Sequence, residues 1–377
     1  MGKITEGGRN MQQLIIRGRG SLNGRNIDAL LAELAVQRPL LVCSQRAAAD
    51  FNARTGMTMP CFSGFHPNPD LSDATAGADM YRKMGCDGLI SVGGGSAMDT
   101  AKAVKALLLA ENMDDVRIGR LPVGKLPHIA IPGTAGTGAE ATPIAVVYEN
   151  NEKLSLDHPT LLPEAIVLDG SLLNTLPLYH KKACALDALC QGIEFYWAVK
   201  RTEDSRIHAE RAILGVLRNL EDYLAGRAAA ADAVLEAAYE SGCAIRISRT
   251  TAAHAMSYQI TKRIGPAHGQ ACMLTLPHLW RRMGEAPVIN ALNALIGTTD
   301  GSELLLGLLA ATDMLPDAMP DDDTLDALTA SVNVQRLGNH PQKLTAEDLR
   351  AVYVKAFTPI EEKERARLTG IWRAYAG

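Results

Sequence analysis

The sequence predicts an α/β domain followed by an all-helical domain, with a ligand site in the cleft between them. Three observations predict this fold class. The chain has 377 residues, which is too long for one ordinary hydrophobic core. In its first half, short apolar runs alternate with helical patterns, which is typical of a domain built on a parallel β-sheet. From about Tyr179 the apolar residues follow a helical period throughout. We therefore expect domains at residues 1–178 and 179–377.

Composition excludes several classes of function. The formal net charge is −4, so no basic excess favours nucleic acid or an anionic membrane. No apolar run approaches the ~18 residues of a membrane span, and the first 25 residues lack the apolar centre of a signal peptide. The seven cysteines contain no Cys-x-x-Cys pair, which favours reduced thiols and a cytoplasmic protein.

The central motif lies between residues 88 and 102. An apolar run, Leu89 to Val92, predicts a buried strand, and the glycines Gly93, Gly94 and Gly95 follow it. Ser96 then stands where a helix N-cap is expected. A strand, a glycine turn and a helix N-terminus allow the backbone to approach a phosphate closely. The alternative interpretation is a tight turn that binds nothing.

Other segments of the first half extend this prediction. A strand at 126–131 leads into a second small-residue loop, Pro132–Glu140, whose Thr134 and Thr137 offer hydroxyls to phosphate or ribose. The strand Pro39–Cys43 is not followed by the carboxylate that binds the ribose of NAD. Ser44 and Arg46 follow instead and could bind a 2′-phosphate, which favours NADP over NAD; the alternative is a loop that takes no part in binding.

The helical half contains polar residues on faces that should be buried. Asp187 and Gln191 are four residues apart, and so are His254 and Tyr258, so each pair shares a helix face. His268 follows a Gly-Pro turn. One Asp and two His, with an oxygen from Gln191, form a reasonable set for zinc or ferrous iron. Each residue alone also has an ordinary interpretation as a helix cap or a hydrogen-bonded core histidine.

These motifs, in this order and spacing, resemble those of the iron-containing (group III) alcohol dehydrogenases, from about Gly20 to Leu279. The resemblance implies a dehydroquinate synthase-like fold with a dinucleotide-binding α/β domain, a helical domain and a metal between them. It also implies a homodimer. The cofactor contacts are then expected from the following residues: Ser44, Asn68, Gly93, Gly94, Gly95, Ser96, Asp99, Lys102, Thr134, Thr137 and Lys153.

The resemblance also implies roles in the helical half. Asp187, His254 and His268 match three metal-ligand positions of the family, and Gln191 stands where the family has a fourth ligand, a histidine. Tyr258 replaces another histidine that the family often has near the nicotinamide. We expect Asp187, His254 and Tyr258 to be catalytic, with Fe2+ or Zn2+ polarising an aldehyde and either a metal-bound water or Tyr258 providing a proton.

Segments 186–194 and 250–258 resemble the phosphonoacetaldehyde reductase branch of the family. The expected reaction is the NAD(P)H-dependent reduction of phosphonoacetaldehyde to 2-hydroxyethylphosphonate, a step of phosphonate biosynthesis. Four basic residues are candidates for binding the phosphonate: Arg246, Arg249, Lys262 and Arg263. The alternatives are a general alcohol, diol or glycerol dehydrogenase, a metal-free reductase, a dehydroquinate synthase-like enzyme and a non-catalytic nucleotide-binding protein.

Overall fold

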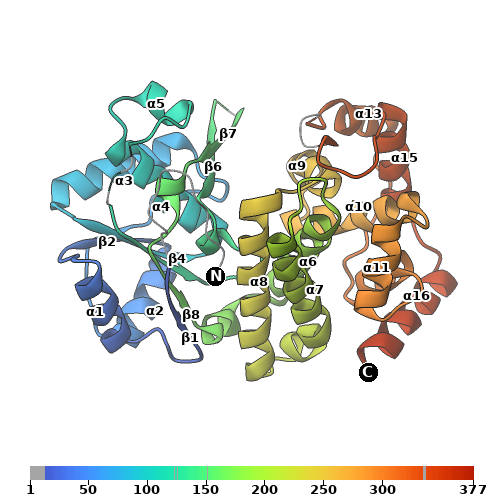
Figure 1. Cartoon of the computed structure of the whole chain (residues 1–377), viewed down its shortest axis with the longest axis horizontal. Helices are drawn as coiled ribbons and strands as arrows, with labels where there is room; N and C mark the ends of the chain where they lie inside the picture. The colour runs from blue at the N-terminus through green and yellow to red at the C-terminus, as the bar shows by residue number, and fades with distance from the viewer. Residues whose placement is uncertain (1–12, 123, 125, 151, 334–336) are drawn as a thin grey trace. The chain divides into compact units, whose positions relative to one another are not determined.

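A computed structural model describes residues 13–122, 124, 126–150, 152–333 and 337–377 of the chain. The chain forms two compact units, residues 1–175 and 176–377. Figure 1 shows strands and helices in the first unit and helices alone in the second, within the described residues.

The first unit is built on a six-stranded parallel sheet with the order β1-β8-β5-β4-β2-β3. Its central strands are buried on both faces, so successive side chains enter two different cores. Leu40 and Val42 of β2 lie in one core, and Leu41 and Cys43 lie in the other. The strands are β1 (Leu14–Arg17), β2 (Pro39–Cys43), β3 (Cys61–Phe62), β4 (Gly88–Gly93), β5 (His128–Pro132) and β8 (Ala165–Leu168).

Helices cover the two faces of this sheet. Apolar residues of α1 and α2 pack into the core that contains Leu41, and those of α3 and α4 pack into the core that contains Leu40. The helices are α1 (Gly24–Glu33), α2 (Gln45–Thr55), α3 (Leu71–Met84), α4 (Gly95–Leu109) and α5 (Met113–Arg117), with short 3-10 turns at Ala139–Ala141, Pro159–Leu161 and Gly170–Thr175.

The alternating apolar residues around Ala145 predict one of the last strands of the main sheet, but this segment does not join that sheet. It is β6 (Ile144–Glu149), and it pairs antiparallel with β7 (Glu152–Asp157) in a separate two-stranded sheet. The turn between them begins at Asn150, which takes a left-handed φ of 53°. Alternation of apolar residues predicts a strand but does not determine its partner.

The second unit contains the helices predicted for the C-terminal half. They are α6 (Leu178–Trp197), α7 (Glu203–Leu224), α8 (Ala228–Ser248), α9 (Ala252–Arg263), α10 (His268–Met283), α11 (Pro287–Ile296), α12 (Gly301–Ala311), α13 (Asp322–Ala330), α15 (Ala346–Phe357) and α16 (Glu362–Ala376). The helical period of the apolar residues predicts a helix over residues 325–337, but α13 ends sooner, at Ala330, and residues 334–336 of that prediction lie outside the described residues.

Where the structure describes the chain, no single helix has the length and hydrophobicity that a membrane crossing requires. The bent pair α11 and α12 meets these criteria only jointly, by length and composition.

Candidate cofactor and metal sites

The glycine motif forms a turn between β4 and α4. Gly93 has a φ of 146°, and Gly94 is the N-cap of α4, so the N-cap predicted at Ser96 is wrong by two residues. A Cβ atom on Gly94 would lie 3.1 Å from Cγ2 of Thr134, and one on Gly95 would lie 3.3 Å from Cγ2 of Thr137. The two loops predicted to bind phosphate therefore lie side by side, because glycine permits their close approach.

A third predicted segment joins these loops. The backbone N–H of Asn68 donates a hydrogen bond to Oγ of Ser96, at 3.2 Å. Asn68 itself has a left-handed φ of 56°, which is unusual for a residue other than glycine. Three segments far apart in sequence thus meet at the N-terminus of α4, an arrangement suited to an anion such as a pyrophosphate.

Lys102 has a different environment from the one predicted. Its side chain is fully buried, and Nζ donates to the carbonyls of Ala139 and Ile144 and to Oγ1 of Thr142. These three acceptors match its three N–H donors, so Lys102 ties the second loop to the start of β6, and the cofactor contact predicted for it stays a prediction. Its nearby partner Asp99 has a pKa raised to about 6 by burial, against the opposing effect of the Lys102 charge.

The structure gives Ser44 and Lys153 contacts within the protein. Ser44 is the N-cap of α2, where its side chain accepts a hydrogen bond from the backbone N–H of Ala47. Lys153 lies on β7 opposite Tyr148, close enough for its charge to lower the pKa of Asp99. The cofactor contacts predicted for both residues stay predictions.

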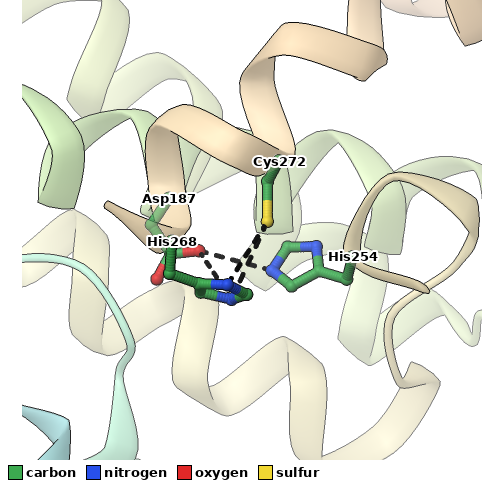
Figure 2. A group of neighbouring side chains, drawn as sticks. All are labelled: Asp187, His254, His268 and Cys272. Carbon is green, nitrogen blue, oxygen red and sulfur yellow. Dashed lines mark hydrogen bonds and ion pairs between the residues drawn. The ribbon is translucent and has the colours of Figure 1, made fainter. Parts of the chain in front are cut away.

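In the second unit, four side chains converge on one point. Asp187, His254, His268 and Cys272 each offer a ligand atom, and these atoms lie within 4.8 Å of one another. Figure 2 shows all four side chains pointing toward a common centre. Oδ1 of Asp187 lies 3.3 Å from Nε2 of His254 and 3.9 Å from Nε2 of His268, and Sγ of Cys272 lies 3.7 Å from Nε2 of His268.

Three helices supply these residues. Asp187 lies on α6, His254 on α9, and His268 and Cys272 are one turn apart on α10. Gly269 allows α10 to approach α6, because a Cβ atom there would lie only 1.9 Å from the carbonyl oxygen of Ala183. The residue after His268 must therefore be glycine for His268 to reach Asp187.

A buried carboxylate orients His254. Nδ1 of His254 donates to Oε2 of Glu194, while Oε1 of Glu194 accepts from the backbone N–H of Ala253 at 2.8 Å and from Oγ1 of Thr251. Because Nδ1 carries the proton, Nε2 of His254 presents its lone pair to the cluster. Carboxylates hold metal-binding histidines in this way.

The cluster is suited to a divalent cation. Oδ1 of Asp187 and Nε2 of His254 are buried without a hydrogen-bond partner among the described residues. Such atoms are costly unless something binds them. Burial alone would raise the pKa of Cys272, but a hydrogen bond with Cys190 and the charges of His254 and His268 lower it well below its usual value. Carboxylate, imidazole and thiolate are all zinc ligands, so the residues present fit the metal that the sequence predicts.

Gln191 and Tyr258, the other two residues predicted for this site, both lie in the second unit. Oε1 of Gln191 accepts a hydrogen bond from Oγ of Ser241, at 2.9 Å, so the amide has a protein partner. Tyr258 lies beside the cluster, with its ring stacked on His268 at a centroid distance of 5.7 Å. Sequence reasoning missed Cys272 and Glu194. The signals were present, because Cys272 is four residues after His268 and Glu194 is seven residues after Asp187, each on the same helix face.

The four basic residues predicted to bind a phosphonate fall into two groups. Lys262 and Arg263 are exposed in the last turn of α9. Arg246 and Arg249 are half-buried at the end of α8. Arg249 has a left-handed φ of 65°, and Nδ2 of Asn339 fixes this segment by donating to the carbonyls of residues 248, 249 and 250.

Known proteins resemble both units. A model of the family described as iron-containing alcohol dehydrogenase matches residues 13–170, and one described as Fe-containing alcohol dehydrogenase family, C-terminal, matches residues 182–357. A phosphonoacetaldehyde reductase of Streptomyces viridochromogenes is 33% identical over 315 residues, or 75% of this chain and 80% of the relative. The lactaldehyde reductase of Escherichia coli is 30% identical over 66% of this chain and 67% of its own length.

Solved structures agree with these matches. A sulfoacetaldehyde reductase from Bifidobacterium kashiwanohense, in complex with NAD+, has a TM-score of 0.78 and 25% identity, covering 94% of this chain and 99% of its own. A 1,3-propanediol oxidoreductase has a TM-score of 0.82 at 22% identity, covering 91% of this chain and 98% of its own. These likenesses confirm the fold class predicted from the sequence.

Proposed function

This chain belongs to the iron-containing alcohol dehydrogenase family, and on that premise we propose that it reduces a small anionic aldehyde, phosphonoacetaldehyde above all. Membership of this family makes the chain an NAD-dependent oxidoreductase that acts on aldehydes and alcohols. The proposed reaction consumes phosphonoacetaldehyde, NAD(P)H and one proton and yields 2-hydroxyethylphosphonate and NAD(P)+.

The observation that carries the proposal is the cluster of Asp187, His254, His268 and Cys272, with two of its buried polar atoms unpartnered. A divalent metal bound by these residues supplies Lewis-acid polarisation of a carbonyl oxygen. Glu194 keeps His254 in the tautomer that offers Nε2, so the donor set is prepared before metal binds.

Tyr258 is the proposed proton donor. It is half-buried, and its ring stacks on His268, the most exposed of the cluster's two histidines. A phenolic O–H is a hydrogen-bond donor and can give its proton to an alkoxide. This favours the direction of aldehyde reduction.

The first unit is proposed to hold the nicotinamide cofactor, which supplies the hydride. The turn at Gly93–Ser96 and the hydroxyls of Thr134 and Thr137 would receive the pyrophosphate at the N-terminus of α4. Ser44 and Arg46 follow β2 at the position where a 2′-phosphate would be bound, so we propose that NADPH is preferred to NADH.

Two relatives support an anionic substrate, since phosphonoacetaldehyde and sulfoacetaldehyde both carry a strongly acidic group one carbon from the aldehyde. We propose Arg249 as the residue that binds this group. It lies five residues before His254, and its strained backbone is held by Asn339. Such strain is maintained where the position of a residue matters, and a guanidinium suits the bidentate binding of a phosphonate.

The test measures NADPH and NADH oxidation with phosphonoacetaldehyde, sulfoacetaldehyde, lactaldehyde and propanal, before and after treatment with a chelator. We expect the highest kcat/KM with phosphonoacetaldehyde, lost with chelator and restored by Zn2+ or Fe2+. Higher kcat/KM on neutral aldehydes would indicate a general alcohol dehydrogenase, and turnover unaffected by the chelator would indicate a metal-free reductase.

A further inference from the structure

We propose that Cys272 is a metal ligand, that it takes the place of Gln191 in the ligand set, and that the metal of this site is zinc. This inference deepens the proposed function and rests on it for the presence of a metal. It concerns a residue that neither the sequence motifs nor the resemblance had indicated.

The distances match a tetrahedral zinc site. With bonds of about 2.0 Å to nitrogen or oxygen and about 2.3 Å to sulfur, neighbouring ligand atoms lie roughly 3.3 to 3.6 Å apart. Asp187 Oδ1 and His254 Nε2 are 3.3 Å apart, and Cys272 Sγ and His268 Nε2 are 3.7 Å apart. Asp187 Oδ1 and His268 Nε2 are 3.9 Å apart, so these two atoms need to move only a few tenths of an ångström closer to share one zinc ion.

Gln191 is the weaker candidate for the fourth position. Its carbonyl oxygen already accepts a hydrogen bond from Ser241, whose helix, α8, does not contribute to the cluster. An amide oxygen is also neutral, whereas a thiolate brings a negative charge to the cation. Cys272 is fully buried on the α10 face that also carries His268, so no movement of the backbone is needed to place both on one ion.

The thiolate favours zinc over ferrous iron. Soft sulfur ligands combined with imidazoles in a tetrahedral arrangement are typical of Zn2+ sites. A given set of nitrogen, oxygen and sulfur ligands also generally binds Zn2+ more tightly than Fe2+. The side chains of Asp187 and His254 are 4% and 3% exposed, whereas that of His268 is 37% exposed. A substrate oxygen would therefore approach beside His268, where zinc can expand to five ligands.

A competing set exists beside this one. Cys190, Glu194 and His254 also place ligand atoms within 4.8 Å of one another, and they would use the opposite nitrogen of His254. However, both oxygens of Glu194 already accept hydrogen bonds, from Ala253, Thr251 and His254 itself. The unpartnered nitrogen of His254 is Nε2, which faces Asp187. The unpartnered ligand atoms therefore belong to the set of Asp187, His254, His268 and Cys272, and this is the set to which we assign the metal.

The experiment loads the full-length protein, freed of metal by a chelator, with Co2+ as a spectroscopic substitute for zinc. A cobalt–thiolate bond gives a charge-transfer absorption in the near ultraviolet. We expect this band in the unmodified protein and in Cys190→Ser, the matched control, and its loss in Cys272→Ser. Zinc affinity, measured by competition with a chromophoric chelator, should fall at least tenfold in Cys272→Ser. Persistence of the band in Cys272→Ser, or its loss only in Cys190→Ser, would overturn the assignment.

A second measurement needs no variant. X-ray absorption at the zinc edge of the unmodified protein should show one sulfur neighbour at about 2.3 Å. A shell of nitrogen and oxygen alone would refute the role of Cys272, and retention of iron in preference to added zinc would refute the choice of metal. These outcomes are independent of catalysis. A protein with the sulfur shell but no aldehyde turnover would contradict the proposed function alone, and aldehyde turnover without that shell would contradict this inference alone.

Discussion

Glu194 accepts a hydrogen bond from Nδ1 of His254, and the two residues lie on different helices, α6 and α9. Both side chains are almost completely buried, at 0% and 3% exposure. The bond fixes the proton on Nδ1 and thereby leaves Nε2 available to the cluster. The same carboxylate also ties down the first turn of α9 through the backbone N–H of Ala253.

This relationship predicts a loss of metal affinity in Glu194→Gln. The amide would direct an N–H group at one of three donors, so the orientation of His254 would be less well defined. We expect the dissociation constant for zinc to rise about 10- to 100-fold. Competition with a chromophoric chelator measures it, and thermal unfolding of the metal-free protein provides the control for folding. An unchanged dissociation constant would contradict the orienting role.

His254→Ala should abolish turnover without affecting the binding of the cofactor. Lewis-acid polarisation lowers the activation barrier by several kcal/mol, so its loss should reduce kcat by about 10³-fold or more. The proposed cofactor loops lie in the other unit, at the start of α4, and should bind NADPH unchanged. Steady-state kinetics and NADPH fluorescence titration measure the two effects. Turnover close to that of the unmodified protein would remove His254 from the mechanism.

Gly94→Val should weaken cofactor binding, because a Cβ atom at this position already lies 3.1 Å from Thr134 and further methyl groups would fill the turn. We expect the dissociation constant for NADPH to rise at least about tenfold, the equivalent of 1.4 kcal/mol. Gly370→Ala is the matched control, since Gly370 lies in α16 with no atom within 4 Å of an added Cβ. Equal affinity in both variants would argue against the predicted phosphate site.

Arg46→Ala should change the preference between the two cofactors. If Arg46 contacts the 2′-phosphate, the KM for NADPH should rise about tenfold, as expected for the loss of one charged hydrogen bond, while the KM for NADH stays the same. Parallel kinetics with both cofactors measure this ratio. An equal change in both values would indicate that the residue has no role in selecting NADP.

The buried side chain of His340 should make the free energy of unfolding depend on pH. Burial lowers its pKa to about 4, against ~6.5 in the unfolded chain. Below pH 6.5 the unfolded chain takes up a proton that the folded chain does not, so stability is lost as the pH falls from about 6.5 to about 4. At about pH 4 the free energy of unfolding should be lower by about 3 kcal/mol than at pH 7 on account of this histidine. Urea unfolding at pH 7, 5.5 and 4.5 measures this slope.

The slope should become shallower in His340→Gln and stay the same in His180→Gln, which changes an exposed histidine. An identical slope in the His340 variant would show that other groups account for the loss. Gln introduces no charge, so any change in slope comes from the histidine that was removed.

The sequence alone determined the features that depend on local spacing. Helical periodicity identified α6, α7, α8 and α15, and the strand–glycine–helix pattern located the turn at Gly94. The i,i+4 relation placed Asp187 and Gln191 on one helix face, and the motif spacing singled out His254 and His268. These are properties of a few consecutive turns, which neighbouring residues decide.

Only the tertiary structure decided which of these side chains meet. Cys272 enters the cluster because Gly269 lets α10 approach α6, and Gln191 is held by Ser241 of α8. Lys102, for which a cofactor contact was expected, donates hydrogen bonds to the backbone carbonyls of Ala139 and Ile144. Contacts between distant helices depend on close packing and on the pairing of every buried polar group, and neither is a property of a single segment.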